Sequence, residues 1–298
     1  MALDINQWLD NNTVSLSGRV VVITGATGGL GRHVVRDLLK TGAKIIMLER
    51  SMSVMQEFSQ ELLKEFPSAE VECIEIDLNQ IQSVNLAVAQ LINRRIDYLI
   101  LNAGVYNVPL TTSQLSYNNV FQINFISQYY LTKQLLPALQ RTNGKVVAVT
   151  SIAHNYVKLV EDDVDFSKQA KKASKVYGNS KRFLTLALSE FFKDRDDVRL
   201  ALVHPGITLT PMTNAKNSKL TGAVMKLLFP KPAVAALNIV RGVFVDINYD
   251  EWIGPKTAKI WGLPTVSKLP TATTEERAKV FNLAESICKV IDKLNSLN

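Results

Sequence analysis

Two residues four positions apart, Tyr177 and Lys181 in the stretch YGNSK, could carry out proton transfer. We expect a helix from Ser174 to about Phe192, in which this spacing places both side chains on one face. A phenol alone is a weak acid, with an ordinary pKa of about 10. A nearby ammonium stabilises the phenolate and brings its proton affinity toward the working range. Since such pairs also arise by chance, the motifs around this one decide its meaning.

A glycine-rich turn, TGATGGLG, follows an apolar run and opens a helical stretch. Its glycines allow a tight turn and a close approach of the backbone to a phosphate, and the free N–H groups at a helix start favour an anion. The spacing is not GxGxxG, but the strand–turn–helix context is the one that a dinucleotide site requires. The turn therefore predicts a cofactor site that includes Gly25, Thr27, Gly29, Leu30 and Gly31.

The next apolar run ends in Glu49-Arg50, and these two residues bear on the choice of cofactor. A carboxylate at this place can accept a hydrogen bond from the ribose 2′-OH of NAD, whereas an arginine can bind the 2′-phosphate of NADP. Glu49 could also pair with Arg50 or point away from the site. Both residues remain candidates, and we expect NADP(H) to be favoured slightly over NAD(H).

Six short runs rich in Val and Ile are expected to be strands buried on both faces: RVVVIT, KIIMLE, VECIEI, IDYLIL, KVVAVT and VRLALV. Stretches with helical periodicity separate them, and Gly42 suits the end of the first helix. This alternation predicts an α/β fold, a doubly wound, mostly parallel sheet with helices on both faces. We expect residues 1–298 to form a single domain, with residues 211–232, which break the alternation, as a candidate substrate lid.

Composition narrows the classes of function. The chain has 298 residues, 47% of them hydrophobic, and a net charge of +7. Its one dense basic run, KQAKKASK, has no interleaved aromatic residues. We expect a solvated loop or helix start, with attraction of an anionic substrate as the alternative, and no nucleic-acid partner. Cys73 and Cys288 are far apart, which indicates reduced, buried or half-buried thiols and no metal site. No targeting or transmembrane segment is visible, and we expect a cytoplasmic protein.

Taken together, the motifs resemble those of the short-chain dehydrogenase/reductase family. The family's patterns TGxxxGxG, NNAG, YxxxK and PGxxxT are similar to TGATGGLG, LNAG, YGNSK and HPGITLT. The resemblance implies a Rossmann fold and an NAD(P)(H)-dependent interconversion of a carbonyl and an alcohol. It also implies further cofactor contacts from Asp77, Leu78, Asn102, Ala103, Gly104, Tyr177, Lys181, Pro205, Gly206 and Thr210.

The same resemblance implies a catalytic set. Ser151, at the carboxyl end of the fifth run, would position the carbonyl oxygen, and Tyr177 would exchange the proton. Lys181 would tune Tyr177, and Asn124, in FQINFISQ, would support a water chain to Lys181. The hydride would come from the cofactor.

The 26 residues from Ser151 to Tyr177 and the motif SxAH resemble a branch that contains retinol dehydrogenases, protochlorophyllide reductases, WW-domain oxidoreductases and daunorubicin C-13 ketoreductase-like proteins. The resemblance runs from about Ser17 to Ile291. His154 has two readings, a packing or capping role and a direct substrate contact.

The sequence indicates only the broad chemical class of the substrate. The candidate lid carries Leu220, Val224, Met225, Leu227, Leu228 and Phe229, which favour a lipophilic ketone, aldehyde or alcohol. With Lys219, Lys226 and Lys231, the same residues are a candidate for peripheral membrane contact. A homo-oligomer is compatible with the family pattern. The alternative function is a non-catalytic NAD(P)-binding regulatory or scaffold protein on the same fold.

Overall fold

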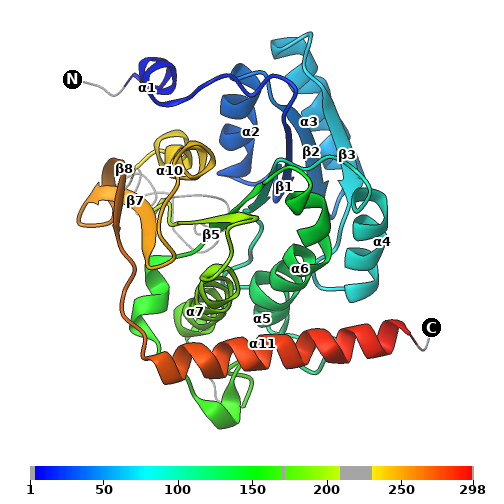
Figure 1. Ribbon diagram of the computed structural model, residues 1–298, viewed down its shortest axis with the longest axis vertical. Helices are drawn as coiled ribbons and strands as arrows, with labels where there is room; N and C mark the ends of the chain where they lie inside the picture. The colour runs from blue at the N-terminus through cyan, green and yellow to red at the C-terminus, as the bar shows by residue number, and fades with distance from the viewer. Residues whose placement is uncertain (1–3, 169–171, 209–229, 297–298) are drawn as a thin grey trace.

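A single eight-stranded sheet organises the computed structural model, which describes residues 4–168, 172–208 and 230–296 (Figure 1). The strand order is β3-β2-β1-β4-β5-β6-β7-β8, and every neighbouring pair is parallel except β7 with β8. The six expected strands are present, as β1 (Val20–Thr24), β2 (Lys44–Glu49), β3 (Val71–Glu75), β4 (Tyr98–Leu101), β5 (Lys145–Val149) and β6 (Arg199–Val203). The predicted doubly wound α/β sheet is therefore confirmed.

Two further strands extend this sheet. β7 (Glu251–Thr257) pairs with β6, and β8 (Trp261–Lys268) returns antiparallel to β7 to form the sheet edge. Both lie in the C-terminal part of the chain, for which the sequence analysis had predicted no strand.

Helices cover both faces of the sheet (Figure 1). One face carries α1 (Ile5–Asn12), α2 (Gly31–Lys40), α3 (Met52–Glu65) and α10 (Pro232–Phe244). The other carries α4 (Ile81–Leu91), α5 (Asn119–Phe121), α6 (Ser127–Gln140), α7 (Ala173–Phe192) and α11 (Thr274–Asn295). The side chains of each parallel strand alternate between the two faces, as the pleat requires.

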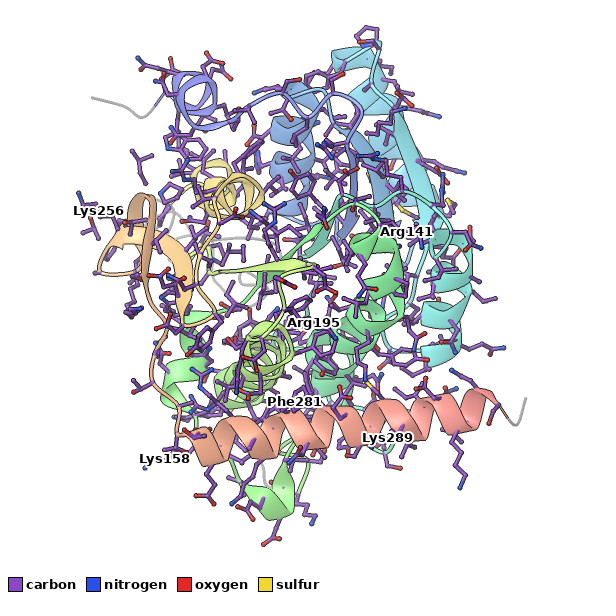
Figure 2. The ribbon with its side chains drawn as sticks, in the orientation of Figure 1. Arg141, Lys158, Arg195, Lys256, Phe281 and Lys289 are labelled. Carbon is purple, nitrogen blue, oxygen red and sulfur yellow. The ribbon has the colours of Figure 1, made fainter. Side chains whose placement is uncertain are left out.

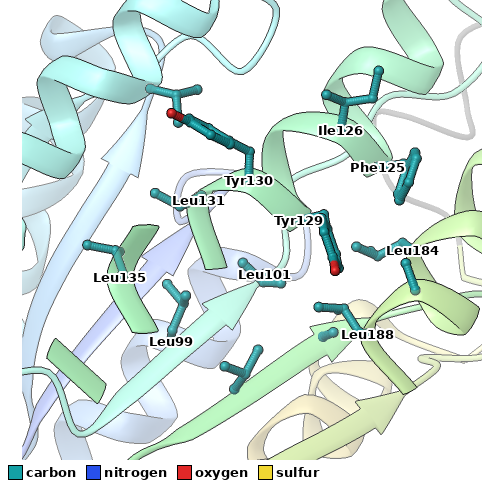
Figure 3. Packing of buried hydrophobic residues seen from close by; sticks show 14 of the residues in the cluster. Leu99, Leu101, Phe125, Ile126, Tyr129, Tyr130, Leu131, Leu135, Leu184 and Leu188 are labelled. Carbon is teal, nitrogen blue, oxygen red and sulfur yellow. The ribbon is translucent and has the colours of Figure 1, made fainter. Parts of the chain in front are cut away.

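The alternation is clear in β4, where Leu99 and Leu101 point to the face of α6 and α7 while Ile100 points to the opposite face. Figure 3 shows Leu99 and Leu101 in one cluster with Tyr129 and Leu135 of α6 and Leu188 of α7. Apolar residues cover both faces of β4, which explains why its sequence is an unbroken hydrophobic run.

Side-chain contacts hold the long helix α11 against this layer. Glu285 accepts hydrogen bonds from Tyr129 Oη at 2.6 Å and from Lys133 Nζ at 2.7 Å. Arg182 of α7 forms a two-pronged ion pair with Glu276, with both N–O distances at 2.6 Å. In Figure 1 α11 runs across α7, so the C-terminal part of the chain braces the helix that contains Tyr177.

Other expectations about single residues were confirmed. α2 ends at Lys40, and Gly42 follows with φ of 85°. Cys73 is half-buried, Cys288 is buried, and both are free thiols. In the described part of the basic run, Lys172 caps the N-terminus of α7 and Lys175 lies in its first turn.

No described helix is long and apolar enough to cross a bilayer.

Asp37 of α2 gives a stability prediction. Burial raises its pKa to about 6, against the partial compensation of Lys40, whose ammonium lies 3.6 Å away. Because the unfolded chain ionises at lower pH, this group lowers stability as pH rises from about 4 to 6 and keeps it lower above that. Asp37→Asn should therefore raise the free energy of unfolding by about 2 kcal/mol at pH 8 and change it little at pH 4.

Urea unfolding at the two pH values measures this difference. The control is Asp10→Asn, which removes an exposed carboxylate from α1. An equal effect of Asp37→Asn at pH 4 and pH 8 would show that ionisation of Asp37 is not the cause.

Candidate active site

The site lies where the chain changes direction in the sheet. From β1 the chain builds outward through β2 and β3 and then returns to place β4 on the other side of β1. The loops after β1 and β4 therefore diverge and leave a crevice at the carboxyl ends of the strands, which is where open α/β sheets bind ligands. A cavity of about 710 Å³ occupies this edge.

Hydrogen bonds tie the β1 and β4 ends together. Thr24 Oγ1 accepts from the backbone N–H of Asn102 at 3.1 Å and of Ala103 at 3.0 Å. In return, Asn102 Nδ2 donates to the carbonyls of Thr24 at 3.1 Å and Gly25 at 2.8 Å. The asparagine of the LNAG motif thus fixes the shape of the glycine turn.

At two positions of the turn, any residue other than glycine would clash with neighbouring atoms. Gly25 has φ of 70°, and a Cβ there would lie 2.8 Å from Ala103 Cα. A Cβ on Gly31 would lie 2.1 Å from the Gly25 carbonyl oxygen. Any side chain at either position would push the turn open.

The same turn suits a phosphate. α2 begins at Gly31 without a side-chain cap and without an acidic residue in its first turn. An anion near these backbone N–H groups would meet the positive end of the helix dipole and no competing carboxylate from that turn. These residues therefore fit the diphosphate of a dinucleotide.

At the end of β2, Glu49 turns toward the glycine turn. Its Oε1 accepts from the Thr27 hydroxyl at 2.9 Å and from the Thr27 N–H at 3.2 Å, and its Oε2 accepts from the Arg50 N–H at 3.3 Å. Within the described residues the Arg50 guanidinium has no ion-pair partner. Both side chains line the cavity, so neither of the two alternatives, a Glu49–Arg50 ion pair or an outward Glu49, is observed.

Tyr177 and Ser151 lie at the opposite end of the cavity. A side-chain hydrogen bond joins the Ser151 hydroxyl to the Tyr177 phenol, and the Tyr106 ring meets the Tyr177 ring edge-on with centroids 5.4 Å apart. Burial raises the pKa of Tyr177 to about 12, which the hydrogen bond from Ser151 only partly offsets. At neutral pH the phenol therefore holds its proton.

Lys181 follows one turn later on α7, as the spacing predicted. Its ammonium donates to the carbonyl of Val149 at 2.7 Å, at the end of β5, and has no hydrogen bond to Tyr177 among the described contacts. Burial lowers the pKa of Lys181 to about 8. Lys181 thus lines the cavity beside the end of β5, and its influence on Tyr177 remains a prediction.

Asn124 lies behind the cavity wall, in a single π-helical turn (η1, Gln122–Ile126) between α5 and α6. Its amide brackets Val105, accepting from the N–H at 2.8 Å and donating to the carbonyl at 3.0 Å, and also donates to Ser180 Oγ at 3.0 Å. Asn124 therefore connects the loop after β4 to α7 next to Lys181. Its role in a water chain remains a prediction.

His154 has a packing role. Its ring is buried, lies 3.3 Å from the Thr185 hydroxyl and stacks on Trp252 of β7 with centroids 5.2 Å apart. It does not line the cavity, and burial lowers its pKa to about 3. Of the two readings of His154, these contacts support packing.

Most of the expected site residues do line one cavity: Gly25, Thr27, Gly29, Leu30, Glu49, Arg50, Asp77, Leu78, Asn102, Ala103, Gly104, Ser151, Tyr177, Lys181, Pro205 and Gly206. Gly31 and Asn124 support its wall from behind. Thr210 and residues 211–229 of the candidate lid lie outside the described residues.

The sequence analysis missed several lining residues, among them Gly28, Tyr106, Ile123, Ile207 and Thr208. Gly28 and Thr208 stand inside quoted motifs and could have been included on that ground. Ile123, in FQINFISQ, and Ile207, in HPGITLT, could have been included on the same ground. Tyr106 lies in a segment without a motif, so only the fold brings it to the site.

Comparison with known proteins agrees with this geometry. Residues 19–221 match the family model described as short chain dehydrogenase. The chain belongs to the short-chain dehydrogenase family. Members of this family are NAD(P)-dependent oxidoreductases, and the residues of the cavity fit that cofactor.

Individual relatives of this short-chain dehydrogenase are distant. The chain is 29% identical over 204 residues to oxidoreductase calI of Penicillium decumbens, covering 65% of this chain and 59% of that protein. It is 30% identical over 210 residues to mouse retinol dehydrogenase 14, covering 65% and 63%. The match thus spans less than two thirds of the length of either relative. The expected likeness to retinol dehydrogenases is confirmed.

Among solved structures, an uncharacterised Mycobacterium paratuberculosis protein superimposes with a TM-score of 0.73 at 25% identity, covering 95% of this chain and 96% of that one. This likeness includes the C-terminal region beyond residue 221. The expectations of a cytoplasmic location, of peripheral membrane contact and of a homo-oligomer remain untested predictions.

The buried Lys181 ammonium gives a second stability prediction. A lysine whose pKa falls to about 8 on folding costs stability at neutral pH, and the cost fades as pH rises toward its ordinary value. Lys181→Met should therefore raise the free energy of unfolding at pH 7 by about 1–2 kcal/mol, after the lost hydrogen bond to Val149 is subtracted. The gain should shrink by pH 10.

Chemical unfolding at pH 7 and pH 10 tests this expectation. The matched control is Lys175→Met, an exposed lysine in the first turn of the same helix. A Lys181→Met variant that is less stable than the wild type at pH 7 would mean that the buried charge carries no net cost.

Proposed function

We propose that this short-chain dehydrogenase reduces the carbonyl group of a lipophilic ketone or aldehyde to an alcohol, with Tyr177 as the proton donor. The observation that carries the proposal is a single cavity whose two ends differ in chemistry. One end is a glycine turn suited to a dinucleotide, and the other is a serine hydroxyl hydrogen-bonded to a protonated phenol.

In this mechanism the residues divide the work. Ser151 and Tyr177 both present hydroxyl groups to the carbonyl oxygen, which fixes its position and favours negative charge there. Bound NAD(P)H supplies the hydride that reduces the carbonyl carbon. Tyr177 gives its phenolic proton to the oxygen, and Lys181, on the same helical face, stabilises the resulting phenolate until it regains a proton.

The protonation state of Tyr177 bears on the direction of the reaction. A pKa near 12 keeps Tyr177 protonated at neutral pH, which suits a group that must donate a proton to a carbonyl. Alcohol oxidation would need the phenolate instead, and burial disfavours it. The state of Tyr177 therefore supports reduction.

The residues that line the main cavity support a lipophilic substrate. Much of the cavity wall is formed by apolar and aromatic groups, among them Val105, Tyr106, Ile123, Val149, Ala153 and Ile207. Such a lining favours an apolar ligand held by a few polar groups. The relative named retinol dehydrogenase 14, whose name indicates an apolar alcohol, supports the same class.

NADP(H) is the cofactor that we propose. Thr27 already engages Glu49, whereas the exposed Arg50 guanidinium at the cavity rim has no partner among the described residues. An arginine that is free in this position can form a charge-assisted pair with a 2′-phosphate. The Glu49 carboxylate nearby would still accept a ribose hydroxyl, so NADH should bind more weakly and not be excluded.

Tyr177→Phe tests the catalytic assignment. Removing the phenolic hydroxyl takes away the proton donor and leaves the ring, so kcat should fall by at least about 100-fold. The Kd for NADPH should stay within about threefold of the wild type, because the glycine turn is unchanged. Loss of NADPH absorbance with lipophilic aldehydes and ketones, together with tryptophan quenching, measures both quantities. A fully active Tyr177→Phe would remove Tyr177 from the mechanism.

Arg50→Ala tests the cofactor assignment. Loss of a charge-assisted contact should weaken NADPH binding roughly tenfold and leave NADH binding unchanged. Titrations of NADPH and NADH against the wild type, Arg50→Ala and the control Arg36→Ala compare them. Arg36 is paired with Glu61 and Glu65 outside the cavity. A wild type that prefers NADH, or equal losses for both cofactors, would contradict the NADP(H) assignment.

A further inference from the structure

A second, smaller cavity of about 290 Å³ adjoins the reaction centre. It shares Ser151, Ala153 and Ile207 with the main cavity and extends away from the glycine turn. Its other walls are Ile152 and Asn155, from the 3-10 turn η2 (Ile152–Tyr156), and the tip of the β7–β8 hairpin at Ala258, Lys259 and Ile260. We call this smaller cavity the side pocket.

The hairpin tip is held in a costly conformation. Ala258 and Lys259 both have positive φ, 49° and 57°, and the Ile260 N–H closes the turn onto the Thr257 carbonyl at 3.0 Å. This two-residue geometry ordinarily selects Asn and Gly, because other residues are strained there. Strain of this kind is found where a side chain must be placed for function. The side chain so placed is Lys259.

Packing fixes the tip against the rest of the site. Lys259 Nζ lies 5.2 Å from the centroid of the Trp252 ring, a cation–π contact. Trp252 is itself fully buried between the rings of His154 and His204. On the other side, a Cβ on Gly206 would lie 2.9 Å from the Ile260 carbonyl oxygen, so the hairpin and the loop after β6 touch.

Lys259 is the one charged residue among the described residues that line the side pocket. Among the described residues no carboxylate pairs with Lys259. Burial lowers the pKa of both His154 and His204 to about 3, so the imidazoles beneath Trp252 are neutral. Asn155, exposed on η2, adds an amide that can donate a hydrogen bond. Lys259 does not line the main cavity, and its charge therefore serves the substrate end and not the dinucleotide end.

We infer that Lys259 and Asn155 bind a carboxylate group of the substrate. The preferred substrates are then lipophilic oxo acids, with the carbonyl at Ser151 and Tyr177 and the acid group in the side pocket. The inference rests on the proposed reductase function and specifies its substrate class.

Paired substrates test this specificity. Terephthalaldehydic acid and its methyl ester present the same aldehyde with and without a charge, and a long-chain ω-oxo fatty acid and its methyl ester do so at a greater reach. With wild-type enzyme, the acid of at least one pair should have a lower KM than its ester. Lys259→Met should raise that KM about fivefold and leave the ester unchanged, as expected for one partly exposed ion pair.

Two further variants sharpen the result. Lys256→Met is the matched control, since Lys256 is on the same hairpin, is exposed and does not line the side pocket, and Figure 2 shows it at the outer edge of the fold. Lys259→Arg keeps the charge and should keep the preference for the acid. Esters preferred over acids by the wild type, or equal effects of Lys259→Met and Lys256→Met, would overturn the inference.

A binding measurement separates this inference from the proposed function. Decanoate has no reducible carbonyl, so calorimetry with decanoate and NADPH-loaded protein reports the side pocket without turnover. Wild type and Lys256→Met should bind it about fivefold more tightly than Lys259→Met. Lys259-dependent binding without reduction of any carbonyl would retain the anion site and reject the reductase. Decanoate binding that is absent or independent of Lys259 would overturn the anion site.

Discussion

The hydrogen bonds between the ends of β1 and β4 are the constraint on which the site depends. Four of them, donated by Asn102 and Ala103 to Thr24 and Gly25, cross the point where the chain reverses its path through the sheet. They hold the glycine turn at a distance that leaves no room for a side chain on Gly25. Because β4 also pairs with β5, the same contacts set the position of Ser151 and of the Val149 carbonyl that receives Lys181.

The sequence predicted best those strands that are buried on both faces. β1, β2, β4, β5 and β6 are covered on both faces, so their residues had to be apolar without interruption, and the runs could be recognised. β8 is an edge strand, half exposed and interrupted by Gly262 and Pro264. Its pairing depends on β7 across a turn with an unusual sequence, so no periodicity indicated it.

The candidate site was predictable to a similar degree. Positions set by local geometry, such as Tyr177 and Lys181 on one face of α7, follow from spacing alone. The partners of those side chains do not. Lys181 reaches the end of β5 rather than the phenol, and Tyr106 meets Tyr177 from a loop without a motif. Such contacts join segments far apart in the chain and require the fold itself.

The two ends of the site come from different parts of the chain, with different physical demands. The loops after β1, β2 and β4 line the end of the cavity that we propose for the dinucleotide, where a phosphate would require close approach of the backbone and therefore glycine. Side chains that follow β5 line the end that we propose for the substrate, and the tip of the β7–β8 hairpin lines the adjoining side pocket. A change at Lys259 touches neither the glycine turn nor the Thr24–Asn102 contacts, because they lie at the other end of the cavity. Substrate choice can therefore vary at the hairpin while hydride transfer is preserved, so the family motifs alone do not specify a substrate.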